Sequence, residues 1–222
     1  MEDTTILDLS NNKAQLMGTI SQDATIFESN GEKFYEFLLE VPRLSGVVDE
    51  IPVTMAKNIA DSYSINPSKG LKIALCGEFR SRNLQDEGKS HLILFFFVKE
   101  VSNKEQINQA DINKISLTGY LCKAPVYRDT PFGRQICDIL LAVNRAHNKK
   151  SDYIPCIIWG RNAVYIKNMP VGTKINLSGR IQSRVYNKQD ENGNITKRKA
   201  YEISVNNFKV ESAPSIAHEE EA

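Results

Sequence analysis

Apolar and polar residues alternate along most of the chain with a period of two, and turn residues bound the alternating segments. This alternation is rich in β-branched and aromatic residues, so it predicts half-buried β-strands rather than helices. In the second half of the chain the pattern predicts five strands, at about 114–122, 135–146, 153–159, 173–186 and 199–210. We therefore expect an all-β protein.

The same pattern occurs twice, with a period of about 100 residues. The segment NKAQLMGTI from Asn12 matches NKISLTGYL from Asn113, and GLKIALCGEFRSR from Gly70 matches GTKINLSGRIQSR from Gly172. Two copies of one domain explain this self-similarity. The expected divisions are an N-terminal extension, a first copy, a linker, a second copy and a short acidic tail, at residues 1–11, 12–102, 103–112, 113–212 and 213–222.

Turn signals and one short helix suggest the architecture of each copy. Pro125 to Gly133 marks the first hairpin of the second copy, and Asn192-Gly193 marks the last. A helical stretch from Asn162 to Asn168 lies between the third and fourth strands and ends before Pro170. Five strands with a helix in that place predict an OB barrel, whereas a five-strand SH3-like barrel would leave the helix without a reason. We expect two tandem OB-fold five-stranded barrels.

Charge is divided unequally between the copies. The 222 residues carry a net charge of +1. Residues 1–112 hold 11 Lys and Arg against 17 Asp and Glu, a net charge of −6, whereas residues 113–212 hold 17 against 7, a net charge of +10. This asymmetry indicates that only the second copy is suited to a polyanion.

Several classes of protein are not expected. No apolar run reaches the roughly 18 to 20 residues of a membrane helix, and the acidic N-terminal segment lacks the order of a signal peptide, so we expect a cytoplasmic location. The four cysteines lack the paired spacing of a zinc site and are expected to be buried, reduced thiols. We expect no metal, no cofactor and no enzymatic activity.

Four motifs in series give the second copy a family resemblance. They are KAPVYRDTPFG from Lys123, LLAVNR from Leu140, YIPCIIWG from Tyr153 and GRIQSRVY from Gly179. In order and spacing they resemble the bacterial single-stranded DNA-binding protein (SSB) family over nearly all of residues 113–212, and only faintly over 12–102. The resemblance implies a nucleoid-associated protein that coats or protects single-stranded DNA in replication, repair or recombination.

The alternation within the third strand agrees with that resemblance. Ile154, Cys156 and Ile158 share one face as a candidate core, which leaves Tyr153 and Trp159 on the other face. Exposed aromatic rings can stack on unpaired bases. The resemblance implies that Tyr153, Trp159 and Tyr186 stack on bases, and that His147 lies near a fourth such place.

Basic residues are interspersed with these aromatic residues and are candidates for phosphate contacts, which dominate affinity for nucleic acids. On the fourth strand Arg180, Arg184 and Tyr186 share a face. The last hairpin is expected to form a basic finger. The candidate cations are Arg128, Arg134, Arg145, Lys149, Lys150, Arg161, Arg180, Arg184, Lys188, Lys197, Arg198 and Lys199.

The first copy differs from the second at each candidate stacking position. Ser45, Glu50, Ala56 and Leu84 align with His147, Tyr153, Trp159 and Tyr186. We therefore interpret the first copy as a barrel whose aromatic binding face has been lost and which acts as a pairing partner. Family members commonly assemble four OB-folds, so a homodimer is expected. The tail SAPSIAHEEEA is acidic but lacks the apolar aromatic tip through which the family recruits partners, so recruitment of replication enzymes is not expected.

Three alternatives remain open on sequence alone. A primosome-type or mobile-element accessory protein of the same family would act through protein contacts. An OB-fold nuclease would need clustered carboxylates for a metal, and the second copy has only scattered ones such as Asp138 and Asp152. A protein-binding or oligosaccharide-binding module is compatible with the fold, although the positive charge argues against sugar.

Overall fold

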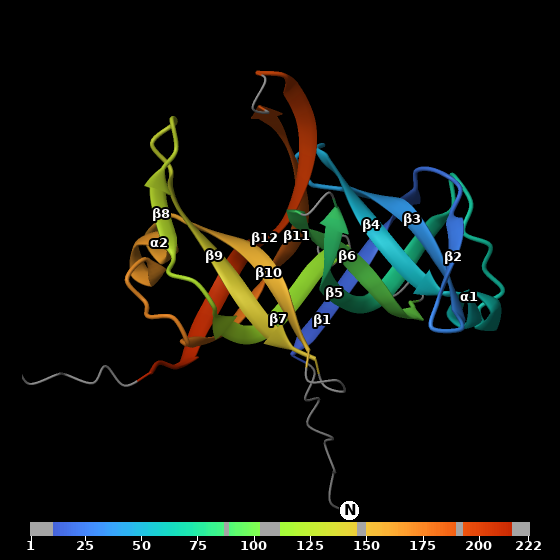
Figure 1. Cartoon of the computed structure of the whole chain (residues 1–222), viewed down its shortest axis with the longest axis horizontal. Helices are drawn as coiled ribbons and strands as arrows, with labels where there is room; N and C mark the ends of the chain where they lie inside the picture. Colours follow the sequence, from blue (N-terminus) through green and yellow to red (C-terminus); the bar gives the residue numbers. More distant parts are fainter. Residues whose placement is uncertain (1–10, 87–88, 103–111, 146–149, 190–192, 215–222) are drawn as a thin grey trace, which may run out of the picture.

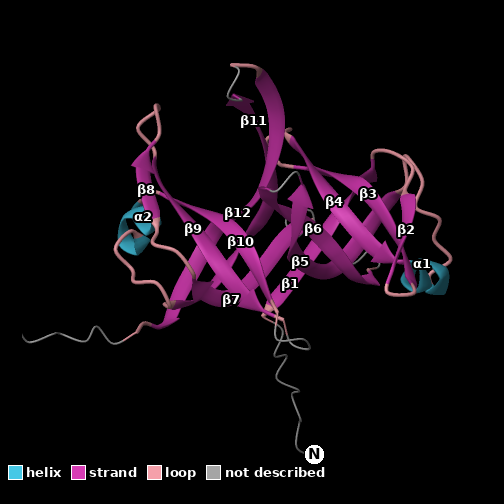
Figure 2. Cartoon of the chain, in the orientation of Figure 1, coloured by secondary structure: helices cyan, strands magenta, loops and turns pink. Residues whose placement is uncertain are grey.

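The computed structural model describes residues 11–86, 89–102, 112–145, 150–189 and 193–214. Twelve strands form one sheet that closes into two barrels (Figures 1 and 2). The first barrel contains β1 (Asn12–Ile20), β2 (Thr25–Ser29), β3 (Glu32–Pro42), β4 (Val48–Ala56), α1 (Lys57–Ser62), β5 (Lys72–Asp86) and β6 (Lys89–Val101). The second contains β7 (Asn113–Leu121), β8 (Val126–Asp129), β9 (Gln135–Asn144), β10 (Ser151–Trp159), α2 (Arg161–Ile166), β11 (Lys174–Gln189) and β12 (Ile195–Ser212).

The predicted elements are all present, with one addition per copy. In the first barrel α1 lies between β4 and β5, and in the second barrel α2 lies between β10 and β11. The helix of the second copy spans residues 161–166, where 162–168 was predicted. The short strands β2 and β8 were not predicted, because β8 lies within the segment interpreted as the first hairpin. Each pairs with one neighbour only, β2 with β3 and β8 with β9, so each is an edge strand added to the five-stranded core. Neither helix in the described chain has the length and hydrophobicity to cross a membrane.

Glycines allow the closest approaches within each barrel. Pairings β1–β3 and β7–β9 close the two barrels. At Gly119, a Cβ atom would lie 2.5 Å from the carbonyl oxygen of Ala142 on the closing strand. At Gly179, beside a β-bulge in β11, it would lie 2.3 Å from the carbonyl oxygen of Ser204. A side chain at either position would push the strands apart, so both positions require glycine.

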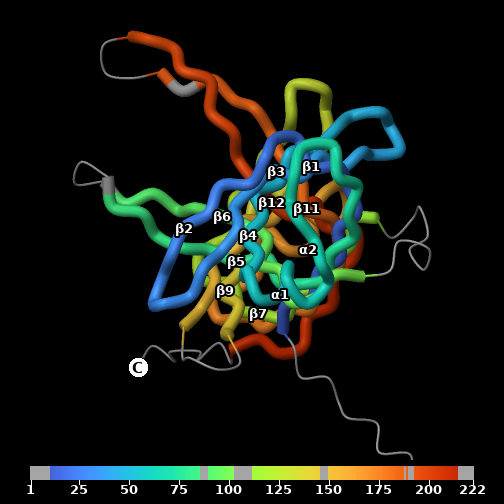
Figure 3. Tube along the Cα trace, turned by 90° about the vertical axis from the view of Figure 1, so that its right-hand side faces the viewer, coloured from blue at the N-terminus to red at the C-terminus, as the bar shows by residue number. Residues whose placement is uncertain are grey.

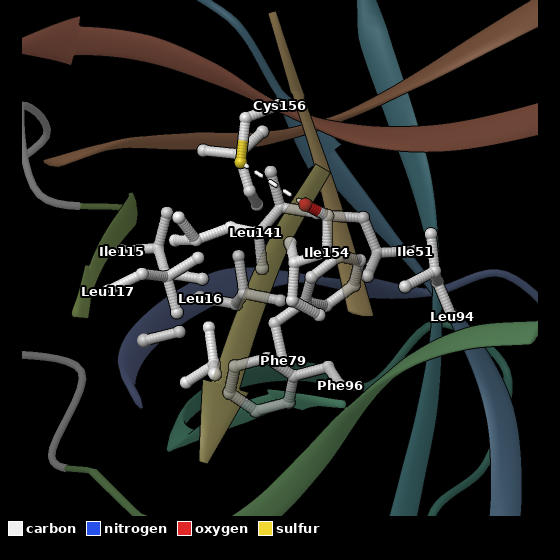
Figure 4. Packing of buried hydrophobic residues seen from close by; sticks show 14 of the residues in the cluster. Leu16, Ile51, Phe79, Leu94, Phe96, Ile115, Leu117, Leu141, Ile154 and Cys156 are labelled. Atoms are coloured by element: carbon white, nitrogen blue, oxygen red, sulfur yellow. Dashed lines mark hydrogen bonds between the residues drawn. The ribbon is translucent and has the colours of Figure 1, made fainter. Parts of the chain in front are cut away.

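A pseudo-two-fold axis relates the two barrels. The strand order β2-β3-β4-β6-β5-β1-β7-β11-β12-β10-β9-β8 runs through equivalent strands in opposite directions from its centre. At that centre β1 and β7 pair antiparallel, with Ala14 opposite Ile115. The barrels are thus joined by backbone hydrogen bonds, and buried residues of both halves form one apolar cluster, in which Leu16, Leu117 and Phe79 lie close together (Figure 4). The two halves therefore pack as one body.

Two reciprocal polar clamps reinforce this junction. Arg43 and Asp49 of the first barrel form a bidentate ion pair with distances of 2.7 and 2.6 Å, and Asp49 accepts a 2.7 Å hydrogen bond from the Ser183 backbone N–H of the second barrel. Asp49 is fully buried. A buried carboxylate with three donors is fully paired, so this clamp fixes the first barrel against β11.

In the second clamp the ion pair belongs to the second barrel and the backbone donor to the first. Arg145 and Asp152 of the second barrel pair at 2.8 and 2.6 Å, and Asp152 accepts a 2.6 Å hydrogen bond from the Ser81 backbone N–H of the first barrel. The Ser81 hydroxyl in turn accepts a 2.8 Å hydrogen bond from the backbone N–H of Tyr153. The first barrel therefore holds the beginning of β10.

Candidate nucleic-acid interface

The outer face of β10 carries exposed aromatic rings over a packed core. Tyr153 is 42% exposed and Trp159 is 38% exposed, whereas the inward-facing Ile154, Cys156 and Ile158 are at most 2% exposed. The predicted alternation of faces in this strand is confirmed. Ile157 faces outward by alternation yet is 5% exposed, so neighbouring side chains cover the middle of the face.

Trp159 is anchored at one edge of its ring. Its indole Nε1 donates a 3.3 Å hydrogen bond to Oγ of Ser204 on β12, the strand that pairs parallel to β10. The indole N–H is thus satisfied within the protein, and the ring remains partly exposed. A ring held in this way can stack on a base without first being ordered.

A row of polar side chains runs along the outer face of β11. Arg180 donates to Gln182 at 3.0 Å, and Gln182 donates to Glu202 of β12 at 2.7 Å. Arg184 lies 3.7 Å from Glu202 and 5.6 Å from the centre of the Tyr186 ring. Tyr186 is 38% exposed. One face of β11 thus carries a third exposed ring, Tyr186, together with two guanidinium groups.

The last hairpin is a long two-stranded ribbon. β11 and β12 stay paired as far as Gln189 opposite Ile195, and the ribbon projects beyond the barrels (Figures 1 and 3). Arg198 lies directly opposite Tyr186, and Lys197 opposite Asn187. Both cations are exposed. Lys199 is instead paired with Glu50 of the first barrel, so its charge is partly neutralised.

A second hairpin, β8–β9, projects on the same side of the molecule as the ribbon (Figure 1). Arg128 on this hairpin pairs with Asp138 at 2.9 Å, while Arg134 is exposed beside the turn. The turn also presents Phe132, which is 92% exposed. Sequence reasoning missed Phe132, although an aromatic residue between Pro131 and Gly133 in a turn has no core to enter.

The remaining candidate site residues lie at the ends of elements or outside the described residues. Arg161 is exposed at the start of α2, and Lys150 is exposed at the start of the segment that leads into β10. Lys188 lies in β11, but its side chain is not described. His147 and Lys149 lie outside the described residues, so the structure gives no position for either.

Arg145 differs from the other candidate cations. Besides its two contacts to Asp152, it donates a 3.0 Å hydrogen bond to the carbonyl oxygen of Ser81. The hydrogen bond to Asp152 raises the pKa of Arg145, so the guanidinium remains charged. Its side chain is only 21% exposed. Because three protein acceptors already occupy this guanidinium, we propose that Arg145 serves the junction between the barrels rather than a phosphate contact.

The first barrel carries aromatic rings away from the positions that align with Tyr153, Trp159 and Tyr186. Glu50, Ala56 and Leu84 are indeed non-aromatic, but other strands supply rings. Phe27 and Phe34 stack at 5.4 Å, Phe34 lies 6.4 Å from Phe97, and Arg80 lies 3.9 Å above the Phe97 ring, as a cluster of partly buried side chains. The copy comparison tested single positions and so missed rings that come from β2, β3 and β6.

The cations beside these rings are paired with carboxylates of the same barrel. Arg80 pairs with Glu78 at 2.6 Å, and Lys99 lies 3.7 Å from the same carboxylate. Arg82 lies 3.4 Å from Glu36. The first barrel therefore presents neutralised cations, which distinguishes it from the basic ribbon of the second barrel.

Neither a metal site nor a reactive thiol is apparent in the described ranges. No group of three or more His, Cys, Asp or Glu side chains among the described residues could hold a metal ion. Burial raises the pKa of the Cys137 thiol to about 11, and it also raises the pKa values of Cys76, Cys122 and Cys156. All four cysteines are free, as predicted, but only Cys137 and Cys156 are buried as predicted, whereas Cys76 and Cys122 are half-buried. Thiols with raised pKa values are poor nucleophiles at neutral pH.

The fold and this face together define a pair of OB barrels, the second with an outer surface of exposed rings and guanidinium groups. Comparison with solved structures confirms the fold. Wild-type single-stranded DNA binding protein from Thermus aquaticus matches with a TM-score of 0.68 at 17% identity, over 91% of this chain and 94% of that one. A deletion mutant of the same protein matches with a TM-score of 0.65 at 18% identity, over 92% of this chain and 97% of that one. Both matches span the two barrels.

Sequence comparison then shows what the second barrel is similar to. Residues 112–211 match the model of the Single-strand binding protein family. A protein named single-stranded DNA-binding protein from Oceanobacillus iheyensis is 36% identical over 85 residues, which are 36% of this chain and 53% of that protein. One of the same name from Clostridium tetani is 38% identical over 85 residues, or 59% of its length. The chain thus spans a little over half of the length of these relatives, and its second barrel is similar to the single-strand binding protein family.

Proposed function

We propose that the second barrel binds single-stranded DNA across the outer faces of β10 and β11 and thereby coats or protects it. One observation carries the proposal. Tyr153, Trp159 and Tyr186 are each 38 to 42% exposed on a barrel whose inward side chains are almost fully buried. Exposing rings of this size to water is unfavourable. Such rings are suited to stacking on bases, which contributes about 1–3 kcal/mol per base.

The cations around these rings supply the phosphate contacts. The similarity of this barrel to the single-strand binding protein family and the names of its relatives support this assignment. We propose that Arg180, Arg184 and the ribbon contact phosphates first, and that the hairpin β8–β9 with Phe132 borders the bound strand. The full proposed set is Tyr153, Trp159, Tyr186, His147, Arg128, Arg134, Lys149, Lys150, Arg161, Arg180, Arg184, Lys188, Lys197, Arg198 and Lys199.

The experiment uses Trp159, the only tryptophan of the chain. Its fluorescence should change on titration with oligo-dT at low salt and stay unchanged with a matched duplex. Trp159→Ala, measured by anisotropy of a labelled oligonucleotide, should weaken binding by about 1–3 kcal/mol. Unchanged emission at saturating DNA contradicts the stacking role of Trp159.

A matched aromatic control is available outside the proposed face. Tyr165 on α2 is 64% exposed and contacts Phe208. We expect Tyr153→Ala to weaken binding of oligo-dT, and Tyr165→Ala to leave it within experimental error. Equal losses from both substitutions would show that exposed rings act without regard to their place in the fold.

Self-association is a separate proposal. We propose that the chain forms a homodimer with four barrels. Light scattering on the purified protein tests this, with an expected mass of twice 25.0 kDa. A stable monomer over the micromolar range contradicts the dimer and leaves the proposed binding face unaffected.

A further inference from the structure

A pocket of about 470 Å³ lies where the two barrels meet. Three segments line it: the turn after β3 from Pro42 to Ser45, the start of β7 at Ile112 and Asn113, and the residues Arg180 and Asn206 of β11 and β12. Two guanidinium groups, one hydroxyl and two amides face this space. Among the described lining residues none has a carboxylate, so the pocket is chemically suited to an anion.

Arg180 is incompletely paired within the chain. One terminal nitrogen donates to Gln182, but the buried Nε has no hydrogen-bond partner in the described structure. Burial lowers the pKa of Arg180, and the nearby charge of Arg43 lowers it further. A buried donor without an acceptor costs about 1–3 kcal/mol. Arg43 is already paired with Asp49, so an anion in the pocket would act mainly on the charge of Arg180.

The first barrel shows how the chain fills the equivalent place. Arg180 follows the bulge glycine Gly179 of β11, and the residue that follows the bulge glycine Gly77 of β5 is Glu78. The carboxylate of Glu78 lies 2.6 Å from Arg80 and 3.7 Å from Lys99. At the pseudo-symmetric position the chain thus provides its own anion, whereas the pocket beside Arg180 has cations and amides only.

We propose that this pocket binds a backbone phosphate of the single strand held by the second barrel through Arg180, with Ser45 of the first barrel completing the site. This inference rests on the proposed function. Arg180 and Tyr186 share one face of β11, and six residues of strand span roughly 20 Å. A strand that stacks on Tyr186 and follows the row of arginines therefore reaches the pocket. The first barrel contributes to binding through its turn and not through its own aromatic face.

The test compares the salt dependence of oligo-dT binding for the wild type and two variants that remove one positive charge each. Arg180→Gln should make the slope of log K against log salt shallower by about 0.7, the value for one phosphate contact on a single strand. Arg80→Gln removes a guanidinium that Glu78 already pairs, so its slope should match the wild type. Trp159 emission at saturation should be the same in all three proteins.

Asn206→Asp provides a second test that does not remove a buried group. Asn206 is exposed at the pocket, and a carboxylate there would occupy the anion site. The variant should unfold at the same or a higher denaturant concentration and yet show the shallower salt slope. A loss of stability together with an unchanged slope overturns the inference.

The outcomes separate this inference from the proposed function. A wild type that leaves Trp159 emission unchanged and binds no oligo-dT refutes the proposed function. A wild type that binds, with a slope that neither Arg180→Gln nor Asn206→Asp changes, refutes only the pocket. Thermal denaturation in inorganic phosphate distinguishes the source of the anion. Stabilisation of wild type but not of Arg180→Gln, with unchanged DNA slopes, would assign the pocket to free phosphate and overturn the strand as its ligand.

Discussion

Removing Asp152 tests the junction between the barrels. Its side chain is 2% exposed and accepts hydrogen bonds of 2.8 and 2.6 Å from Arg145 and of 2.6 Å from the Ser81 backbone N–H. Asp152→Ala leaves a partly buried guanidinium without its counterion and a buried N–H without an acceptor. Breaking a buried pair by removing one partner costs about 3–5 kcal/mol.

We expect a value near 3 kcal/mol, because the Arg145 side chain keeps 21% of its surface exposed and water screens part of the unpaired charge. That loss is a large part of the free energy of unfolding of a domain, which is roughly 5–15 kcal/mol. Asp49→Ala removes the pseudo-symmetric carboxylate, which has the equivalent three donors and a longer fourth contact from the Ser183 hydroxyl, so its cost should agree within about 1 kcal/mol.

Urea denaturation followed by circular dichroism measures both costs. The double substitution Arg145→Met with Asp152→Asn keeps an acceptor for the Ser81 N–H and leaves no charge unpaired, so it should recover most of the lost stability. It should also bind oligo-dT as the wild type does. A cost below about 1 kcal/mol for Asp152→Ala would refute the clamp as a source of stability, and a tenfold loss of DNA affinity in the double variant would restore Arg145 as a phosphate contact.

Three further predictions concern the binding face, the ribbon and the core. Ser81→Ala removes the acceptor of a 2.8 Å hydrogen bond at the start of β10, so it should weaken oligo-dT binding two- to tenfold by anisotropy, whereas its mirror Ser183→Ala should cost similar stability in urea and no affinity. Lys197→Ser with Arg198→Ser should make the salt slope shallower by about 1.4, and an unchanged slope would remove the ribbon from the interface. Folding keeps Cys137 protonated up to a pKa of about 11, while its unfolded thiol ionises near pH 9, so the unfolding free energy should fall between pH 9 and 11, less so in Cys137→Ala.

The fold could be predicted because its signals are local. Alternation along β10 depends only on the geometry of one strand, which is why the buried set of Ile154, Cys156 and Ile158 was found from sequence. Because the pattern occurs twice, the elements predicted in one copy could be checked against those of the other. The edge strands were missed because four residues such as those of β8 carry too short a pattern to be distinguished from a turn.

The contacts that organise the site could not be predicted, because their partners are distant in sequence. Ser81 and Asp152 are 71 positions apart, and Asp49 and Ser183 are 134 apart. Arg145 was interpreted as a phosphate contact because it lies in a basic copy; its counterion Asp152 is near in sequence, but its other partner, the Ser81 carbonyl, is 64 positions away. The pocket beside Arg180 likewise exists only once two barrels are packed together.

The covalent linkage of two barrels about a pseudo-two-fold axis has a consequence for strand polarity. In a dimer of identical subunits every substitution occurs on both sides of the axis, so a ligand meets the same contacts from either direction. Here the equivalent positions differ: Tyr153 corresponds to Glu50 and Arg180 to Glu78. A single strand that crosses from one barrel to the other would therefore meet two different faces, and the two directions along that strand would not be equivalent.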